Sequence, residues 1–405
     1  MRTLFFLLFL LSIDLYAFQA VRTSMQGTAV QWRNLVYGIY WFIPALAVLM
    51  MFTSDWNWPK QLWTFLRAMV FIAYLSKFFI AVVVLLDDLR RLLGMGYHWA
   101  AGKPGFDASR SRFLSQLGLM IGAVPFTSLT YGMIRNPYRY KVYRQDVALD
   151  QLPEELDGLR IVQISDIHSG SFNFKEPVES AIAMINAEQP DLVFFTGDLV
   201  NNVATEMEPF VDVFDKIQAK HGVYSILGNH DYGDYVPWKS PEEKRANMER
   251  LYGTHRQMGW DLLLNEHRLL NIKGRQLAVI GVENFSAHLR FPKYGDLAAA
   301  AAGTESADLH LLLSHDPSHW EYQVLNDYPH IAITFSGHTH GMQFGVEIPG
   351  WFKWSPIQYV YKQWAGLYRQ GGQYLYVNRG LGFLGYPGRV GILPEISVLT
   401  LRRNA

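Results

Sequence analysis

Long apolar stretches in the first third of the chain constrain its fold more than any other sequence feature. They run from Thr3 to Phe18, Leu35 to Phe52, Trp63 to Leu86 and Phe113 to Met133. A helix needs about 20 apolar residues, within a range of roughly 17–25, to cross the hydrocarbon core of a bilayer. The last three stretches fit this length. We therefore expect a multi-span α-helical membrane region over residues 1–134, with about four transmembrane helices.

The first apolar stretch has two interpretations. It is short, contains Asp14 and follows Arg2, as a signal peptide would, yet no clean small-x-small cleavage triplet follows it. A retained helix is favoured, and a signal peptide stays an alternative. The third stretch carries Arg67 and Lys77, and such residues either snorkel toward the headgroups or face a partner inside the membrane.

Positive charges do not fix how the chain is oriented across the cell (inner) membrane. With four spans, six Lys and Arg residues lie on the side of the C-terminal domain and seven on the other side. The positive-inside rule therefore decides nothing, and we favour an extracytoplasmic C-terminal domain. Residues 135–158 are expected to form a juxtamembrane linker, either in contact with anionic headgroups or simply solvated.

Composition limits the chemistry of the remaining chain. The 36 basic and 36 acidic residues balance, which argues against a nucleic-acid-binding protein. There is no cysteine, so disulfides and thiolate metal sites are excluded. Any metal must be bound by His, Asp, Glu, Asn or backbone groups.

Five short β-branched runs in the C-terminal part each end at residues that can bind metal. A plausible helix over 177–188 between the first two runs gives the strand–helix–strand order of an α/β fold. The carboxyl ends of strands in such sheets are where ligands bind, so we expect these polar groups to converge. The runs and their endings are Arg160–Ser165 before Asp166 and His168, Asp191–Thr196 before Asp198, Val223–Leu227 before Gly228–Asp231, Leu309–Ser314 before His315, and Ile331–Ser336 before Gly337–His340.

The spacing and charge of these residues suit divalent metals. In extended chain, residues i and i+2 point the same way, so Asp166 and His168 could hold one ion, and His338 and His340 could do likewise. Two divalent ions with Asp166, Asp198 and a bridging hydroxide leave the site positive, which attracts a phosphate group. Mixed nitrogen and oxygen ligands suit manganese, iron or zinc without choosing among them.

As an ordered set, these motifs resemble the calcineurin-like metallophosphoesterase superfamily, and in particular its bacterial transmembrane branch. The resemblance implies an α/β metallophosphoesterase domain, an α/β/β/α sandwich, over residues 159–405. It implies two divalent transition-metal ions and a metal-bound hydroxide that attacks a phosphate ester or pyrophosphate. It also implies roles for individual residues: Asp166, His168 and His340 at the first metal, Asn229, His315 and His338 at the second, Asp198 bridging, His230 beside the leaving group, and Asp231 supporting the loop.

One departure from the protein phosphatases of this superfamily concerns His230. They have an Asp three residues after the bridging Asp, followed by Arg, whereas this chain has Asn201 and Asn202. This puts a carboxylate–His230 pair in doubt and weakens a protein-phosphatase interpretation. We expect a membrane-anchored hydrolase that acts on a phosphate ester, including lipid-linked or envelope substrates, with membrane lipids as its surroundings. The alternative is a non-catalytic membrane protein with a structural or regulatory metal site.

Overall fold

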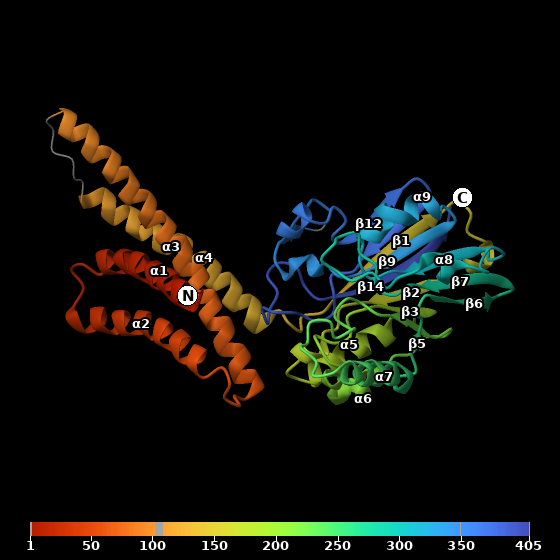
Figure 1. Cartoon of the computed structure of the whole chain (residues 1–405). Helices are drawn as coiled ribbons and strands as arrows, with labels where there is room; N and C mark the ends of the chain where they lie inside the picture. The colour runs from red at the N-terminus through yellow and green to blue at the C-terminus, as the bar shows by residue number, and fades with distance from the viewer. Residues whose placement is uncertain (1, 102–107, 349, 405) are drawn as a thin grey trace. The chain divides into compact units, whose positions relative to one another are not determined.

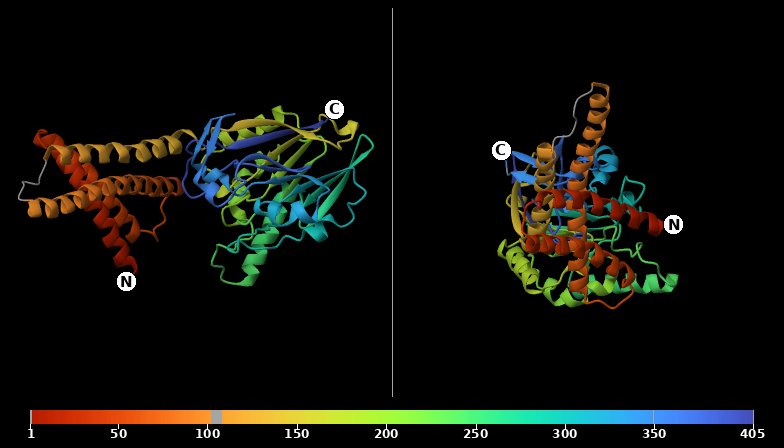
Figure 2. Two further views of the ribbon diagram at one scale, coloured as in Figure 1. Left: turned by 90° about the horizontal axis from the view of Figure 1, so that it is seen from above. Right: turned by 90° about the vertical axis from the view of Figure 1, so that its left-hand side faces the viewer.

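The computed structural model describes residues 2–101, 108–348 and 350–404, and the chain divides into two compact units (Figures 1 and 2). The N-terminal unit covers residues 1–132 and the C-terminal unit covers residues 133–405. Within the described residues of the N-terminal unit lie four helices that are long and apolar enough to cross a membrane. They are α1 (Arg2–Ser24), α2 (Val30–Phe52), α3 (Lys60–Ala101) and α4 (Ala108–Arg135).

A buried ion pair joins the first and third helices of the N-terminal unit. Lys77 Nζ lies 2.7 Å from Asp14 Oδ1, and both side chains are buried. The Tyr74 hydroxyl donates to the other carboxylate oxygen at 2.9 Å, and the Tyr40 hydroxyl of α2 donates to the Asp14 carbonyl at 2.6 Å. Charged groups inside a membrane are costly unless they are paired in this way. Lys77 therefore faces a partner instead of snorkelling.

Small residues let α3 and α4 approach closely. Gly118 and Gly122 of α4 are spaced as in a GxxxG motif, and a Cβ on Gly122 would lie 2.4 Å from Ile80 of α3. Such close approach brings the two backbones into van der Waals contact, which is a main source of helix association in lipid.

Two six-stranded mixed sheets form the C-terminal unit. In the first sheet the strand order is β1 (Lys141–Leu149), β14 (Glu395–Arg403), β2 (Arg160–Ile164), β3 (Leu192–Thr196), β4 (Val223–Ile226) and β5 (Asp261–Leu262). In the second sheet the order is β12 (Gly366–Gln370), β13 (Gln373–Val377), β9 (Ile331–Ser336), β8 (Leu309–Leu313), β7 (Arg275–Gly281) and β6 (Glu266–Ile272). The strands β2 to β5 are parallel, as are β7, β8, β9 and β13. A separate antiparallel hairpin consists of β10 (Val346–Ile348) and β11 (Phe352–Trp354).

Alternating side chains on the strands produce four layers. Along β3, Val193 and Phe195 pack against helices on one side, while Leu192 and Phe194 point into the core between the two sheets. The outer face of the second sheet packs through Ile280 and its neighbours against α8 and Trp320. The helices are α5 (Glu176–Ala187), α6 (Val211–Phe214) and α7 (Pro241–Gln257) on the first sheet, and α8 (Leu297–Ala301) and α9 (Leu325–Asp327) on the second. This is the α/β/β/α sandwich expected from the sequence (Figure 1).

Part of the range that we expected to be a linker is a strand of the C-terminal unit. Within residues 135–158, Lys141–Leu149 forms β1, which pairs in parallel with β14 along its whole length. Its buried Val147 and Leu149 join the core between the sheets. The strand was missed because its partner lies about 250 residues away, and local pattern carries no information about such a pairing.

Candidate metal centre

The five strands predicted to end in polar residues are β2, β3 and β4 of the first sheet and β8 and β9 of the second. Their carboxyl ends therefore meet across the sandwich. Immediately after the strands the backbone turns sharply. Positive φ angles occur at Asp166 (50°), His168 (46°), Asp198 (60°), His338 (72°) and His340 (51°). These side chains are aimed by left-handed backbone, which non-glycine residues seldom adopt.

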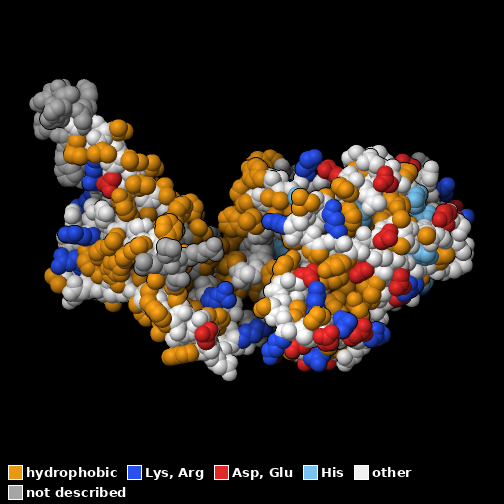
Figure 3. Space-filling model, in the orientation of Figure 1, with side chains coloured by type: hydrophobic (Ala, Val, Ile, Leu, Met, Phe, Trp, Pro, Cys, Tyr) orange, Lys and Arg blue, Asp and Glu red, His pale blue; other side chains and the backbone are white. Residues whose placement is uncertain are grey.

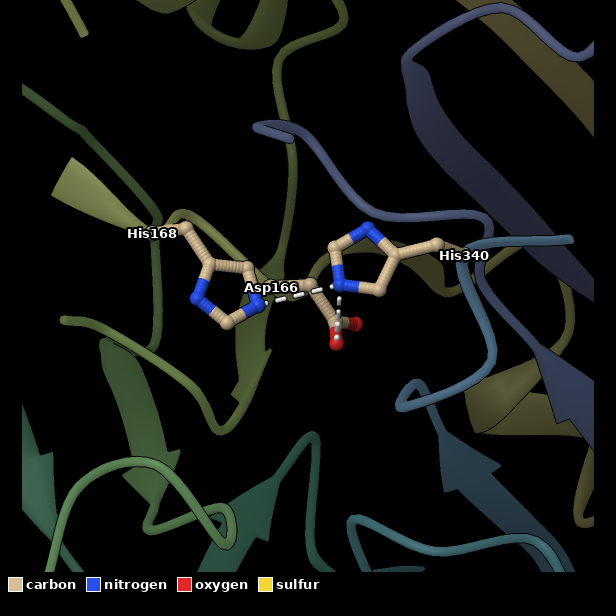
Figure 4. A group of neighbouring side chains, drawn as sticks. All are labelled: Asp166, His168 and His340. Atoms are coloured by element: carbon tan, nitrogen blue, oxygen red, sulfur yellow. Dashed lines mark hydrogen bonds and ion pairs between the residues drawn. The ribbon is translucent and has the colours of Figure 1, made fainter. Parts of the chain in front are cut away.

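One group of possible metal-binding atoms comes from the loops after β2 and β9. Ligand atoms of Asp166, His168 and His340 all lie within 4.8 Å of one another, and all three residues are buried. His340 Nε2 is 3.2 Å from Asp166 Oδ1 and 3.0 Å from His168 Nε2. Figure 4 shows the three side chains converging on one point.

A second group comes from the loops after β3, β8 and β9. Ligand atoms of Asp198, His315 and His338 again lie within 4.8 Å of one another. His315 Nε2 is 3.2 Å from Asp198 Oδ2 and 3.3 Å from His338 Nδ1. The groups are adjacent, since Asp198 Oδ2 is also 3.6 Å from His168 Nε2. Asp198 thus lies between them.

His338 and His340 do not lie in one group, contrary to the expectation from their spacing. We expected them to hold one ion from one extended strand end, but the structure places them in different groups. Both residues have positive φ, as do Asp166 and His168, so the i, i+2 rule for extended chain applies to neither pair and does not determine which side chains share a group. The division implied by the family resemblance instead matches the two groups.

Asn229, which follows β4, offers an amide oxygen to the same region. Its Nδ2 donates to the Tyr235 hydroxyl at 2.9 Å, whereas its buried Oδ1 has no hydrogen-bond partner among the described residues. A buried acceptor without a donor is costly, and a cation would satisfy it. The side chains present therefore fit divalent metal, with nitrogen and oxygen donors and no sulfur.

Most of these side chains have pKa values that favour the protonation state that binds metal. Burial lowers the pKa of His168 to about 3 and that of His338 to about 4, so both imidazoles are neutral at pH 7. Burial alone would raise the pKa values of Asp166 and Asp198, but neighbouring histidines outweigh it and hold both below their usual range. His315 differs: burial opposes its protonation, but Asp198 and Asp166 outweigh that effect and raise the pKa of His315 to about 10.

The second nitrogen of His315 shows how one ligand is oriented. His315 Nδ1 lies 2.7 Å from the Thr196 carbonyl oxygen, which can only accept. The Nδ1 proton is fixed there, so Nε2 points into the second group and becomes available when its own proton leaves.

His230 lies beside both groups but belongs to neither. Its backbone N–H donates to Asp198 Oδ1 at 2.8 Å, and its Nδ1 donates to the Asn201 carbonyl at 2.7 Å. Its ring centroid is 5.0 Å from that of His168. A backbone carbonyl therefore fixes this ring, even though position 201 is Asn instead of Asp.

Asp231 supports the loops and lies outside both groups. Its two carboxylate oxygens accept hydrogen bonds from the backbone N–H groups of Gly228, Asp198, Leu199 and Val200, at 2.8, 2.8, 2.8 and 3.3 Å. This carboxylate connects the turn after β4 to the turn after β3.

Several residues around the cavity were missed by the sequence analysis. Five of the candidate ligands line the cavity together with His230, Arg290, Phe291, Thr339, Ile357, Tyr361 and Leu384. Tyr361 donates to Asp316 Oδ2 at 3.1 Å and lies 2.9 Å from His338 Nε2. Arg290 brings a positive charge from the loop after β7. Neither residue stands in a recognisable pattern, so no local signal pointed to it.

Comparison with known proteins identifies the family to which the chain belongs. Residues 159–342 match the family model for calcineurin-like phosphoesterase, and residues 1–137 match the model for a probable calcineurin-like phosphoesterase transmembrane domain. The metallophosphoesterase YkuE of Bacillus subtilis is 30% identical over 304 residues, which cover 73% of this chain and 98% of YkuE. The chain belongs to the calcineurin-like phosphoesterase family.

Two other relatives add detail. The transmembrane protein with metallophosphoesterase domain of Danio rerio is 30% identical over 303 residues, 73% of this chain and 64% of that protein. The UDP-2,3-diacylglucosamine pyrophosphatase LpxG of Chlamydia muridarum is 27% identical over 307 residues, 65% of this chain and 89% of LpxG. The predicted family and fold class are confirmed. This calcineurin-like phosphoesterase is a membrane protein and a metal-dependent hydrolase of phosphate esters.

Proposed function

We propose that this phosphoesterase holds two divalent transition-metal ions and cleaves the phosphate ester or pyrophosphate of a lipid-linked substrate. The observation that carries the proposal is the pair of adjacent Asp/His groups, with Asp198 between them. Asp166, His168 and His340 would hold one ion. Asn229, His315 and His338 would hold the other, and Asp198 would contact both. Manganese, iron and zinc all suit these ligands.

Divalent ions bound there would polarise the phosphoryl group and supply an activated water at neutral pH. The chain's own residues supply the rest. Arg290, at the same cavity, would bind a phosphate oxygen, because its guanidinium is always charged and suits phosphate geometry. His230 would protonate the leaving oxygen through Nε2, because Nδ1 is fixed on the Asn201 carbonyl.

The lipid-linked substrate is supported by two facts. The chain carries helices able to span a membrane, and the similar Chlamydia muridarum protein is a pyrophosphatase of a diacylated nucleotide sugar. We also propose that the C-terminal unit lies outside the cytoplasm. A single cysteine at Gly372, in a chain that has none, tests this by labelling with an impermeant reagent in intact cells. Labelling only after lysis would place the unit inside.

The substrate class is tested with the full-length chain in nanodiscs. Metal-depleted protein is reloaded with manganese, iron or zinc and offered a nitrophenyl monoester, a nitrophenyl diester and a lipid pyrophosphate. We expect turnover with the lipid pyrophosphate, at least one active metal, and about two bound ions per chain by elemental analysis. Turnover of soluble esters alone would contradict the lipid-linked substrate. One ion at full activity would contradict the dinuclear site.

The role of His230 is tested by its dependence on the leaving group. His230→Ala should lower turnover by about 10²–10⁴-fold, the usual contribution of a positioned acid, and leave metal content nearly unchanged. The loss should be smaller for a nitrophenyl ester, whose leaving group needs little protonation. His338→Ala is the matched control, which we expect to lower metal content instead. An equal loss with good and poor leaving groups would contradict proton donation by His230.

A further inference from the structure

The segment from Met342 to Val360, between His340 and Tyr361, exposes an unusual amount of apolar surface. Eight large apolar side chains are exposed among the 18 described residues of this segment, whereas seven are spread over the remaining described residues of the C-terminal unit. The eight are Met342, Phe344, Val346, Ile348, Trp351, Phe352, Tyr359 and Val360. Figure 3 shows hydrophobic side chains gathered on the surface of this unit. We call this segment the apolar hairpin segment, since it contains β10 and β11.

Alternation along the hairpin separates apolar from charged residues. Val346 pairs with Trp354 and Ile348 with Phe352, so these four side chains share one face. Val346, Ile348 and Phe352 are 48%, 44% and 49% exposed. Trp351, between the strands, is 81% exposed. A free face of this kind, with an exposed Trp beside it, is rare on soluble surfaces.

Both charged residues of the segment belong to the opposite face and are used internally. Glu347 accepts from the Tyr143 hydroxyl at 3.0 Å and from Arg379 at 2.6 Å. Lys353 donates to the Ala365 carbonyl at 2.6 Å and to the Tyr368 hydroxyl at 3.2 Å. The hairpin therefore directs its charges toward its own unit and its hydrocarbon and aromatic groups toward the surroundings.

We infer that the apolar hairpin segment inserts into the surface of a lipid bilayer. Trp, Phe and Tyr are the side chains that favour the boundary between headgroups and acyl chains. A protein partner would be matched by a rim of polar groups around the apolar centre, but this face offers few. The helices of the same chain also keep a bilayer permanently at high local concentration.

Insertion would bring the metal cavity to the level of lipid headgroups. The segment begins two residues after His340, its Ile357 lines the cavity, and Tyr361 directly after it does too. A phosphate on a membrane lipid could then reach the cavity while its acyl chains stay in the bilayer. This consequence rests on the proposed function, whereas the insertion itself does not.

Fluorescence in the full-length chain tests the insertion. Trp351→Cys is labelled with an environment-sensitive fluorophore in nanodiscs of phosphatidylethanolamine and phosphatidylglycerol, and Gly372→Cys, in the exposed turn between β12 and β13, is the matched control. We expect blue-shifted emission and quenching by spin-labelled acyl chains at position 351 only. Emission typical of water with quenching by iodide would overturn the inference. Blue-shifted emission without lipid quenching would also overturn it, since protein would then cover the segment.

Activity measurements separate this inference from the proposed function. Phe352→Asp should lower turnover of a lipid-embedded phosphate by at least about tenfold, the effect of losing one buried aromatic side chain, and leave a soluble nitrophenyl ester unaffected. Leu269→Asp on β6, 43% exposed, is the control for adding a charge elsewhere. Equal losses for both substrates in Phe352→Asp would overturn the inference. Lipid quenching at position 351 without turnover of any phosphate would contradict the proposed function and leave the insertion standing.

Discussion

Five candidate metal ligands have positive φ angles, a conformation that costs a residue other than glycine roughly 1–3 kcal/mol each. They keep it because each loop is fixed by other contacts. The N–H of His338, for example, donates to Asp166 Oδ1 and Oδ2 at 3.0 Å. Metal binding therefore requires little rearrangement of the backbone. It does require that His315 lose a proton.

That proton makes metal affinity depend on pH. The pKa of His315, raised to about 10, means that the metal-free protein carries an imidazolium at neutral pH. Binding through Nε2 requires the neutral ring, so one proton must leave. Affinity for the second ion should rise by up to about tenfold per pH unit from pH 7 to 9. Calorimetry of the metal-depleted protein in buffers of different ionisation enthalpy should count one released proton. His315→Ala, which removes this ligand, should abolish the proton release together with most of the binding of the second ion.

At the scale of elements, the turns after β3 and β4 form one structure because Asp231 connects them. Four buried backbone N–H groups donate to its carboxylate. The positions of Asp198 and Asn229, which belong to different strands, are therefore set by a residue outside the candidate ligand set.

Removing this carboxylate should affect both stability and metal. In Asp231→Asn, the amide NH₂ group would replace one carboxylate oxygen and could not accept from the backbone N–H groups. Each buried N–H left without a partner costs about 1–3 kcal/mol. We expect roughly 3 kcal/mol or more of lost stability and a lower metal content. Thermal unfolding of the purified full-length protein and elemental analysis would measure both. Asp212→Asn, on the surface, should leave both values unchanged, and an unchanged unfolding temperature in Asp231→Asn would contradict this role.

The same elements explain what the sequence could and could not predict. The strands β2, β3, β4, β8 and β9 were predictable because each is a short apolar run that ends in a polar residue. The strand β1 was not predictable, because it depends on a partner strand far along the chain. The division of His338 and His340 between the two groups was not predictable either, because it depends on left-handed backbone. Arg290 and Tyr361 reach the cavity through loops whose course local pattern does not encode.

At the scale of the whole molecule, the status of α1 decides how many helices hold the protein in the membrane. Asp14 of α1 is joined to Lys77 of α3, and both side chains are buried. A cleaved signal peptide would leave Lys77 buried without its carboxylate, which costs several kcal/mol. These observations favour a retained helix over the signal-peptide alternative.

Two measurements test the retention of α1. Mass spectrometry of protein purified from membranes should detect peptides that contain Asp14. Lys77→Met, which leaves Asp14 unpaired, should destabilise the N-terminal unit by about 3–5 kcal/mol, whereas the double variant with Asp14→Asn should recover most of that loss. Arg67→Met, at an exposed position of α3, is the control. A mature chain that begins after residue 20 would contradict the prediction.

The way the chain leaves α4 bears on how the enzyme could ever be released from its membrane. The last turn of α4 already belongs to the C-terminal unit, which begins at residue 133. Asn136 donates to the Arg389 carbonyl at 2.8 Å, the ring of Tyr138 packs against Phe172 and Phe383, and β1 begins at Lys141. A protease needs several residues of extended, unbound chain in its active site. The chain between α4 and β1 is held by contacts with the C-terminal unit. Proteolytic release of a soluble phosphoesterase would therefore require prior local unfolding.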